Sequence, residues 1–494
     1  MPKPFTPAPC AARARLCAPI AIVVAMTVSP STVSAEGLQS VVARALANNP
    51  ELGAIRFNRR AIDHELTAAR GLKLPTVDLK ADSGRHRDYN RTALNIVSGN
   101  EFHDHRNVSV IGSQRIFDGF EARHEEARQR NRVESARWRV TDTANSIALR
   151  AVQAYLEVQR ADAVLHAARA NLSAHQRLLS RVSTRVAGGR GTGSDESEAR
   201  GRVANAQAIV AEAEQRVRDA HALFRSIVGD APRSLGPAPI PTKALPASVE
   251  AAVAEARVAA PSILATRHDT TAAEAAIGST YARFMPRLNF ELSTDHAWGN
   301  REASDRTIDT RAMFVVRWNL FNGGIDKARV WEAKARALEA QEISQSTERI
   351  VERETRVSWN AIQAANERVP ALKRQVDQVR LTRSAYSQQF DAGQRRLLDL
   401  LNIQGESFIA EASLRTEEFA RTFNSYRILA AMGRLVPALG LEMPAEAAMP
   451  HAPTIKHGWR DGWENWTTVY RDYHRQKWSD VDVKSAKDPH APVK

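Results

Sequence analysis

Three short motifs contain residue types that could bind a ligand or carry out catalysis. The run Gly189–Ser194 is glycine-rich like a phosphate-binding loop, but it lacks the closing Lys-Ser/Thr pair and follows a helical segment instead of a strand. The triplet His103–His105 lies in a polar stretch without further ligands, which favours a solvated surface over a metal site. No Ser, His and Asp grouping follows a nucleophile-elbow pattern. We therefore predict that the chain is not an enzyme and holds no cofactor or metal.

Residues 1–35 have the basic start, short apolar run and small closing residues of a secretory signal. An anchor helix is disfavoured because the apolar run is short and Pro19 interrupts it. Both cysteines, Cys10 and Cys17, lie inside this segment, so a mature chain that begins at Glu36 would contain none. Disulfides, thiolate metal sites and cysteine nucleophiles are thereby excluded. No later segment reaches the ~18 apolar residues of a membrane-spanning helix.

The chain has 494 residues and a formal net charge of +13. An exported basic protein is unsuited to a nucleic-acid partner, and no helix carries a basic stripe with interleaved aromatics. The positive charge fits anionic envelope surfaces or an acidic cargo better. With 25% charged and only 6% aromatic residues, the composition suits long helices packed along narrow seams.

The chain contains two similar halves. Pro50 and Pro75 recur as Pro261 and Pro286, 211 residues later (261 minus 50). Farther on, landmarks recur 204 residues apart (321 minus 117): Phe117/Phe321, Gly119/Gly323, Tyr155/Trp359, Gly189/Gly393, Asp195/Asp399 and Gly229/Gly433. We predict a duplication, because one spacing over so long a stretch is improbable by chance. The predicted boundaries are a first repeat at 36–229, a linker at 230–246, a second repeat at 247–436 and a tail at 437–494.

Each half contains two stretches with the period-two alternation of strands. The second repeat shows it clearly, with apolar residues at Leu288, Phe290 and Leu292 and again at Phe314, Val316, Trp318 and Leu320. The first repeat shows it at Val77, Leu79 and Ala81 and at Val108 and Val110. We expect the polar segment 83–106 between these two to be a loop.

Very long helical segments follow the strands. Residues 120–187 contain no proline, and at ~1.5 Å per residue they would form a rod of ~100 Å. Its apolar residues follow a heptad pattern rich in alanine, and His175 on that seam is expected to be a tolerated polar core residue. The counterpart in the second repeat contains Pro370, which should bend it at a cost of ~3 kcal/mol. Tight tips at 188–193 and 391–394 lead into shorter return helices.

Four strands with membrane-like alternation cannot close a barrel, and open strand edges are not tolerated in lipid. Single-chain bacterial barrels begin at ~8 strands. Three chains with four strands each would supply twelve. The sequence therefore predicts an oligomeric membrane barrel on a long helical tube.

This duplicated order of helix, two strands, long helix, glycine tip and helix resembles the TolC family of outer-membrane factors. The resemblance covers about residues 36–440 and rests on Ser113–Gly119, Asn319–Gly324, Phe390–Gly393 with Leu398–Leu401, and Ala431–Gly433. It implies a mainly α fold with a small transmembrane β part, assembled as a homotrimeric channel-tunnel in the cell outer membrane. Twelve strands would form its barrel in outer-membrane lipid, on a coiled-coil tube that projects into the periplasm. The implied partners are a periplasmic adaptor (membrane fusion protein) and an inner-membrane ABC or proton-driven transporter.

The resemblance also implies a gate at the periplasmic tips. Asp399 matches an acidic ring of the pore, whereas Asn402 stands where a second Asp is usual, so that ring would be uncharged. Arg395 matches the arginine of the constricting network, with Asp195 as its partner on the other tip. Phe390 replaces the usual tyrosine and lacks the hydroxyl for one hydrogen bond of the latch.

A simpler interpretation of the tip residues remains open. Asp195 and Asp399 could merely begin helices, with Asp195 and Glu198 as a capping pair. In either case Gly189, Gly193 and Gly393 are expected to form the hairpin tips.

The predicted function is a passive export duct, in the first place for type I protein secretion. The nearest alternative is the outer component of a multidrug or metal efflux pump. A periplasmic adaptor or a coiled-coil spacer is disfavoured, because neither would need two pairs of strands with aromatic faces. In the tail, Trp459, Trp463, Trp466 and Tyr470 have helical spacing and are expected to pack on the tube, and residues after Val481 are expected to be disordered.

Overall fold

The structure is a computed structural model that describes residues 36–86, 90–91, 97–98, 102–298 and 306–448. The predicted signal segment, the aromatic helix of the tail and the segment after Val481 lie outside the described residues.

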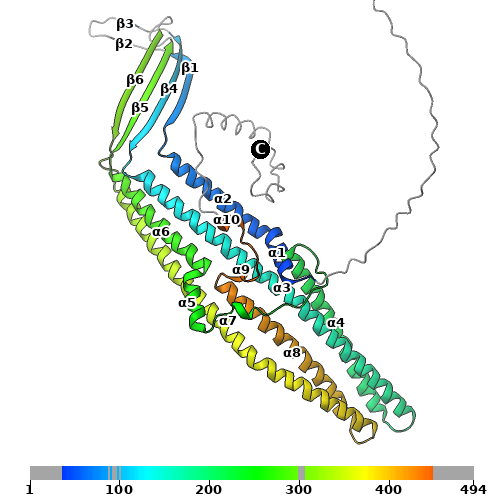
Figure 1. Cartoon of the computed structure of the whole chain (residues 1–494). Coiled ribbons are helices and arrows are strands. Elements are labelled where there is room, and N and C mark those ends of the chain that lie inside the picture. Colours follow the sequence, from blue (N-terminus) through cyan, green and yellow to red (C-terminus); the bar gives the residue numbers. More distant parts are fainter. Residues whose placement is uncertain (1–35, 87–89, 92–96, 99–101, 299–305, 449–494) are drawn as a thin grey trace, which may run out of the picture.

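The described chain runs twice from helices through strands to a long helical hairpin (Figure 1). The first pass contains α1 (Leu38–Asn48), α2 (Pro50–Gly71), β1 (Thr76–His86), the short β2 (Asn90–Arg91) and β3 (Val97–Ser98), β4 (His103–Phe117), α3 (Glu121–Ala187) and α4 (Gly193–Val228). The second contains η1 (Thr242–Ala244), α5 (Val249–Ala259), α6 (Pro261–Tyr281), η2 (Ala282–Phe284), β5 (Arg287–Trp298), β6 (Arg306–Arg317), α7 (Ile325–Asp391) and α8 (Leu397–Ala431). Two short helices follow, α9 (Leu435–Ala438) and α10 (Ala445–Ala448).

The long helix α3 is the centre of the helical part. It packs against α2 and α6 in the half nearer the sheet, and against α4 and α8 in the half nearer the tips (Figure 1). The main core lies where these two halves meet, around the fully buried Ile147, Tyr155 and Leu429. Small side chains such as Ala151 allow the close approach of helix axes that this core requires.

The predicted heptad seam of α3 is confirmed. Ala154, Val158, Ala161 and Val182 are all buried. His175 is only 5% exposed, and burial together with the nearby charge of Arg202 lowers its pKa, as expected for a neutral core imidazole. In the second repeat α7 continues through Pro370 without interruption.

The four long strands form one antiparallel sheet in the order β1-β4-β5-β6, so that β1 and β6 are its edges. Two sequence predictions about strand ends are wrong. β1 extends to His86 and β4 begins at His103, inside the expected loop 83–106, because a strand with one wet face tolerates polar residues there. β6 ends at Arg317, and Trp318 lies beyond it.

The strand register separates apolar from charged residues. Directly opposed pairs place Leu79 beside Val110, Gly112 beside Leu292, and Phe290 beside Phe314, all on what we call the apolar face. The other face, the polar face, carries Asp78, Lys80, Asp82, Glu291, Asp295, Asp309, Arg311 and Arg317. This is the pattern of a transmembrane barrel wall, in which one face meets lipid and the other meets water.

Ion pairs stabilise the polar face. Arg311 lies 2.7 Å from the carboxylate of Asp309 and 3.7 Å from that of Asp295, and so bridges two acidic residues that are opposed in the register. Arg317 pairs with Glu291 at 3.3 Å. A like-charge pair across two strands is thus compensated by a third side chain.

The region of His103–His105 forms the start of β4 instead of a loop. Within the described residues, no group of three His, Cys, Asp or Glu side chains is arranged to hold a metal ion. The same part of the chain contains no helix that is both long and apolar enough to cross a membrane.

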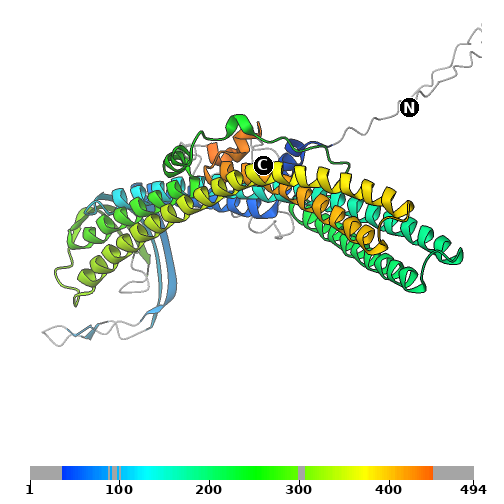
Figure 2. The same ribbon diagram turned by 90° about the horizontal axis from the view of Figure 1, so that it is seen from below.

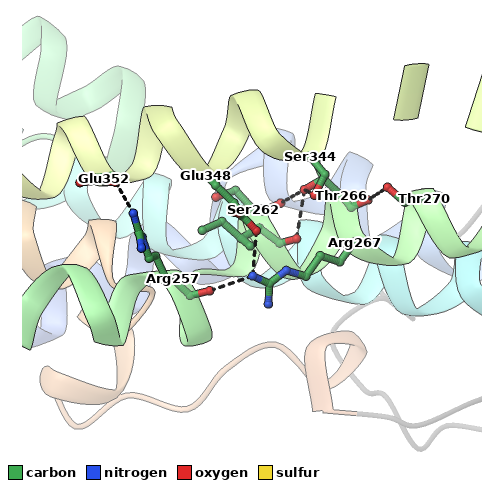
Figure 3. Close-up of polar contacts among 9 residues, drawn as sticks. Arg257, Ser262, Thr266, Arg267, Thr270, Ser344, Glu348 and Glu352 are labelled. Carbon is green, nitrogen blue, oxygen red and sulfur yellow. Dashed lines mark hydrogen bonds and ion pairs between the residues drawn. The ribbon is translucent and has the colours of Figure 1, made fainter. Parts of the chain in front are cut away.

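Short elements gather around the middle of the long helices, on one face of the helical layer (Figure 2). There Arg257 of α5 pairs with Glu352 of α7 at 2.7 Å, and Arg267 of α6 pairs with Glu348 at 2.8 Å (Figure 3). Thr266 and Ser344 add a contact between hydroxyls at 3.4 Å. We call this face the equatorial face.

The segment between the two repeats is fixed to both of them. The hydroxyl of Tyr155 on α3 donates to the backbone carbonyl of Gly236, and the hydroxyl of Tyr426 on α8 donates to that of Pro239 at 2.5 Å. Burial raises the pKa of Tyr426 to about 12, so this donor remains protonated. Glu36, the first of the described residues, is attached to the same segment, since its backbone N–H donates to the Ser234 carbonyl at 2.7 Å.

Candidate functional site: the hairpin tips

The two helical hairpins end in the same backbone turn. Gly189 and Gly393 follow α3 and α7 with φ of +67° and +75°, a conformation that favours glycine. Beyond each glycine a backbone N–H reaches back into the last helical turn, Arg190 to Arg185 and Gln394 to Gln389, both at 2.8 Å. These are Schellman turns, as expected for the predicted tips. Gly193 is different, because it is the first residue of α4 and its φ is not positive.

The two return helices begin differently. α4 has a reciprocal capping box, in which the Thr192 hydroxyl accepts from the Asp195 N–H at 3.2 Å and the Asp195 carboxylate accepts from the Thr192 N–H at 3.1 Å. The predicted capping pair of Asp195 with Glu198 is therefore wrong, since Thr192 is the partner. α8 begins after Arg396 without a side-chain cap, and Asp399 lies in its first turn.

Arg395 links three parts of the second tip. Its guanidinium lies 3.8 Å from the ring centre of Tyr386, its Nε donates to Gln389 at 3.2 Å, and its Nη1 lies 3.5 Å from the carboxylate of Asp399. Among the described residues of the two tips, no ion pair joins Arg395 to Asp195 in the single chain. The Asp195 carboxylate instead accepts from the Thr192 N–H within its own tip.

Phe390 is the centre of the contact between the hairpins. It is only 6% exposed, and the guanidinium groups of Arg181 and Arg185 lie 5.6 and 4.7 Å from its ring centre. Arg185 also donates to the Phe390 carbonyl at 2.9 Å, and Arg181 pairs with Asp391. The end of α3 therefore holds the end of α7 through two arginines that stack on one aromatic ring.

Asn402 connects the two return helices. Its side-chain oxygen accepts from Nη2 of Arg202 on α4 at 3.1 Å. The neutral amide can accept this bond without adding negative charge. The contact lies one helical turn beyond Asp399 on α8.

Four of the predicted site residues line one cleft between the two tips: Asp195, Phe390, Gly393 and Arg395. Asp399 and Asn402 do not line it. Beneath the cleft lies a small separate core, which includes Val182, Leu397 and Leu401. This core contains side chains of both hairpins, so the two tips share apolar packing as well as the stacking and ionic contacts.

Sequence reasoning missed Arg181 and Arg185. The available signal was two arginines four residues apart in the last turns of a long helix, which places both on one side of it. That signal says which side they share, but it cannot identify Phe390, 205 residues away from Arg185, as their partner.

Comparisons with known proteins agree with this geometry. A family model described as "Outer membrane efflux protein" matches residues 41–230 and 252–434, more than half of the chain. "Outer membrane efflux protein BepC" of Brucella suis is 24% identical over 431 residues, covering 86% of this chain and 91% of that protein. "Outer membrane protein TolC" of Escherichia coli is 25% identical over 435 residues, covering 84% and 86%.

The fold is also similar to solved channel structures. The crystal structure of CusC superposes with a TM-score of 0.70 at 16% identity, over 83% of this chain and 96% of that one. Together with the sheet and the paired hairpins, these matches establish a TolC-like fold and a place in the outer membrane. The chain belongs to the outer membrane efflux protein family.

Proposed function

We propose that the chain is the outer-membrane exit duct of a tripartite export system, built as a homotrimer. The observation that carries this proposal is the sheet, which has one apolar and one charged face and two open edges, β1 and β6. Open edges are costly in lipid, so β6 of one copy must pair with β1 of the next. Three copies would close twelve strands around a water-filled lumen, continuous with helices of ~100 Å.

The long helix α7 also supports assembly with further copies. Ile343, Ile350 and Val357 follow one another at intervals of seven and are 52%, 43% and 47% exposed. Apolar residues at heptad spacing form a seam that requires a partner helix. We assign this seam to contact with a neighbouring copy.

The tips would form the gate of this duct. In a trimer, three copies of Asp399 around a narrow axis would attract cations, and Arg395 beside each carboxylate would moderate their repulsion. Asp195 would accept a contact from Arg395 of a neighbouring copy. Opening would require separation of Phe390 from the two arginines of α3, so we add Arg181 and Arg185 to the gate.

The cargo of the duct is proposed in two versions. The first is protein, in a type I secretion system with a periplasmic adaptor and an ABC transporter. The second is a drug or metal ion, driven by an ABC or proton-driven pump. The similarity to a protein named "Outer membrane efflux protein BepC" supports the second version. In both versions the transporter supplies the energy and the duct is passive.

The proposal is tested by the native mass of the full-length protein, extracted from outer membranes in mild detergent. We expect a detergent-dependent trimer whose chains begin at Glu36. A monomer that is soluble without detergent would contradict the duct and would favour a periplasmic adaptor or spacer. The cargo versions are separated in a strain that lacks this protein, by measuring secreted protein and drug or metal tolerance in parallel.

A further inference from the structure

The second repeat carries a group of cations without carboxylate partners where the sheet meets the helices. Lys327 and Lys334 lie seven residues apart near the start of α7, and Arg283 lies in η2. Arg283 and Lys327 are exposed, and Lys334 is half-buried. In the described part of the chain none of the three forms an ion pair. Their positive charge is therefore open to an external anion.

Exposed aromatic residues lie beside Lys334 and just beyond the end of β6. Nζ of Lys334 lies 4.9 Å from the ring centre of Trp331 and 5.7 Å from that of Tyr281. Trp331 is 61% exposed, and Trp318, just beyond β6, is 57% exposed and donates its Nε1–H to the Phe284 carbonyl at 3.0 Å. Large apolar rings with a polar atom are enriched at the level where a bilayer meets water.

The heptad positions show which side of α7 presents this group. Lys327 and Lys334 stand 21 and 14 residues before Glu348, whole numbers of heptads, and Trp331 stands 21 before Glu352. Glu348 and Glu352 contact α6 and α5 on the equatorial face (Figure 3). The lysines and Trp331 therefore lie on the equatorial side of α7. The seam of Ile343 and its heptad neighbours lies elsewhere on the helix.

The first repeat neutralises its own cations at the corresponding place. Three of them converge on the carboxylate of Glu126: Arg70 at 3.3 Å, Lys73 at 2.5 Å and Arg130 at 3.0 Å. The offset of 204 places Val330 where Glu126 stands, and Lys334 where Arg130 stands. The second repeat thus keeps one of the three cations, as Lys334, but replaces the carboxylate with a buried apolar side chain.

We propose that these residues form a binding site for acidic phospholipid headgroups. The junction site, as we call it, consists of Arg283, Lys327 and Lys334 with Tyr281, Trp318 and Trp331. It lies at the end of the apolar face that adjoins the helices, the level at which headgroups of the tube-facing leaflet begin. Phosphate and carboxyl groups of acidic lipids would supply to Lys334 the negative charge that Glu126 supplies to Arg130 in the first repeat, and each basic residue adds favourable surface electrostatics.

The test is lipid retention by the full-length, delipidated protein in mild detergent, followed by native mass spectrometry. Phosphatidylglycerol and phosphatidylcholine with the same acyl chains are the probes. We expect preferential retention of phosphatidylglycerol, and roughly tenfold weaker retention by a Lys327→Gln/Lys334→Gln variant. The matched control is Arg130→Gln in the first repeat, which should retain the lipid like the wild type.

Two outcomes would overturn the junction site. One is a wild-type protein that retains both lipids equally, which needs no variant and so cannot be confused with misfolding. The other is a lysine variant that retains phosphatidylglycerol normally while its oligomer falls apart, which would assign the lysines to the contact between copies. Neither outcome involves transport, so the proposed export function would stand or fall separately.

Discussion

The helices α3 and α7 occupy equivalent places in the two repeats and have equal lengths, 67 residues each, but their surroundings differ. In α3, 24 residues are buried, whereas in α7 only 12 are. α3 is enclosed by α2, α4, α6 and α8 of its own chain, and α7 has α6 and α8 on one side and the short α5. The two equivalent helices therefore differ in role: α3 is enclosed by its own chain, whereas α7 keeps an exposed side to which a further chain could bind.

The largest effects on assembly and folding are expected when a charged residue is introduced into an apolar position of each of these helices. Ile350→Asp on α7 should leave the chain folded but abolish the trimer, because the charge enters the seam between copies. Ile147→Asp on α3 should prevent folding, because Ile147 is fully buried within one chain. Native mass and circular dichroism check both results, with Ile350→Leu as the control. If the Ile350→Asp protein remained trimeric, α7 would not be the contact between copies.

A second comparison concerns the glycines that precede the two long helices. A Cβ at Gly119 would lie 2.6 Å from Cβ of Met285 and 2.8 Å from the Ala282 carbonyl oxygen, whereas a Cβ at Gly323 would meet nothing within 4 Å. Both glycines have positive φ. Gly119→Ala should lower the free energy of unfolding by about 3 kcal/mol, and Gly323→Ala by about 1 kcal/mol from backbone strain alone. Thermal unfolding in one detergent measures the difference, and equal losses would contradict the close packing at Gly119.

A variant at the contact between the tips should have a smaller effect than Ile350→Asp or Gly119→Ala. Arg185→Ala removes a cation from the Phe390 ring at a cost of about 1–2 kcal/mol, enough to raise the open fraction roughly tenfold. We expect higher conductance in planar bilayers, and similar increases for Arg395→Ala and Asp195→Ala. Arg177→Ala is the matched control, since within the described part of the chain Arg177 bonds only to Ser173 on its own helix. Unchanged conductance in a variant would remove that residue from the gate.

The smallest effect concerns α10, which packs against α2 and α3 of the first repeat. Burial alone would raise the pKa of Glu446, but hydrogen bonds from Arg56 and Arg60 outweigh it and hold the pKa below its usual value. The attachment is thus complete above the ordinary glutamate pKa and is lost as the pH falls through the lowered pKa of Glu446.

Glu446→Gln should reproduce this loss at neutral pH. We expect about 1 kcal/mol weaker attachment of α10, since the arginines are partly exposed, and severalfold faster proteolysis near residue 440. Glu442→Gln, in the same segment but exposed, is the control. Equal cleavage of both variants would show that the carboxylate does not hold α10.

Most of the fold could be predicted because it depends on periodicity. The constant offset of 204 residues predicts the duplication, and the heptad pattern of α3 predicts a helix of that length. The strand ends at His86 and His103 could not be predicted in this way, because polar side chains on the wet face of a sheet look like a loop in sequence. The contacts of Phe390 depend on how two distant hairpins meet, which local spacing does not determine.

The link between the repeats has a mechanical consequence. Tyr155 of α3 and Tyr426 of α8 bind this link at two carbonyls three residues apart, those of Gly236 and Pro239. The link thereby fixes the end of α8 that is remote from the tip against α3. From Tyr426 to Leu397 the helix spans 29 residues, or about 44 Å. A rotation of α8 by ten degrees about this anchored end would displace its tip by about 8 Å, several times the length of a hydrogen bond. The segment between the two repeats would thus be the pivot about which a small rotation of α8 produces a large displacement of its tip.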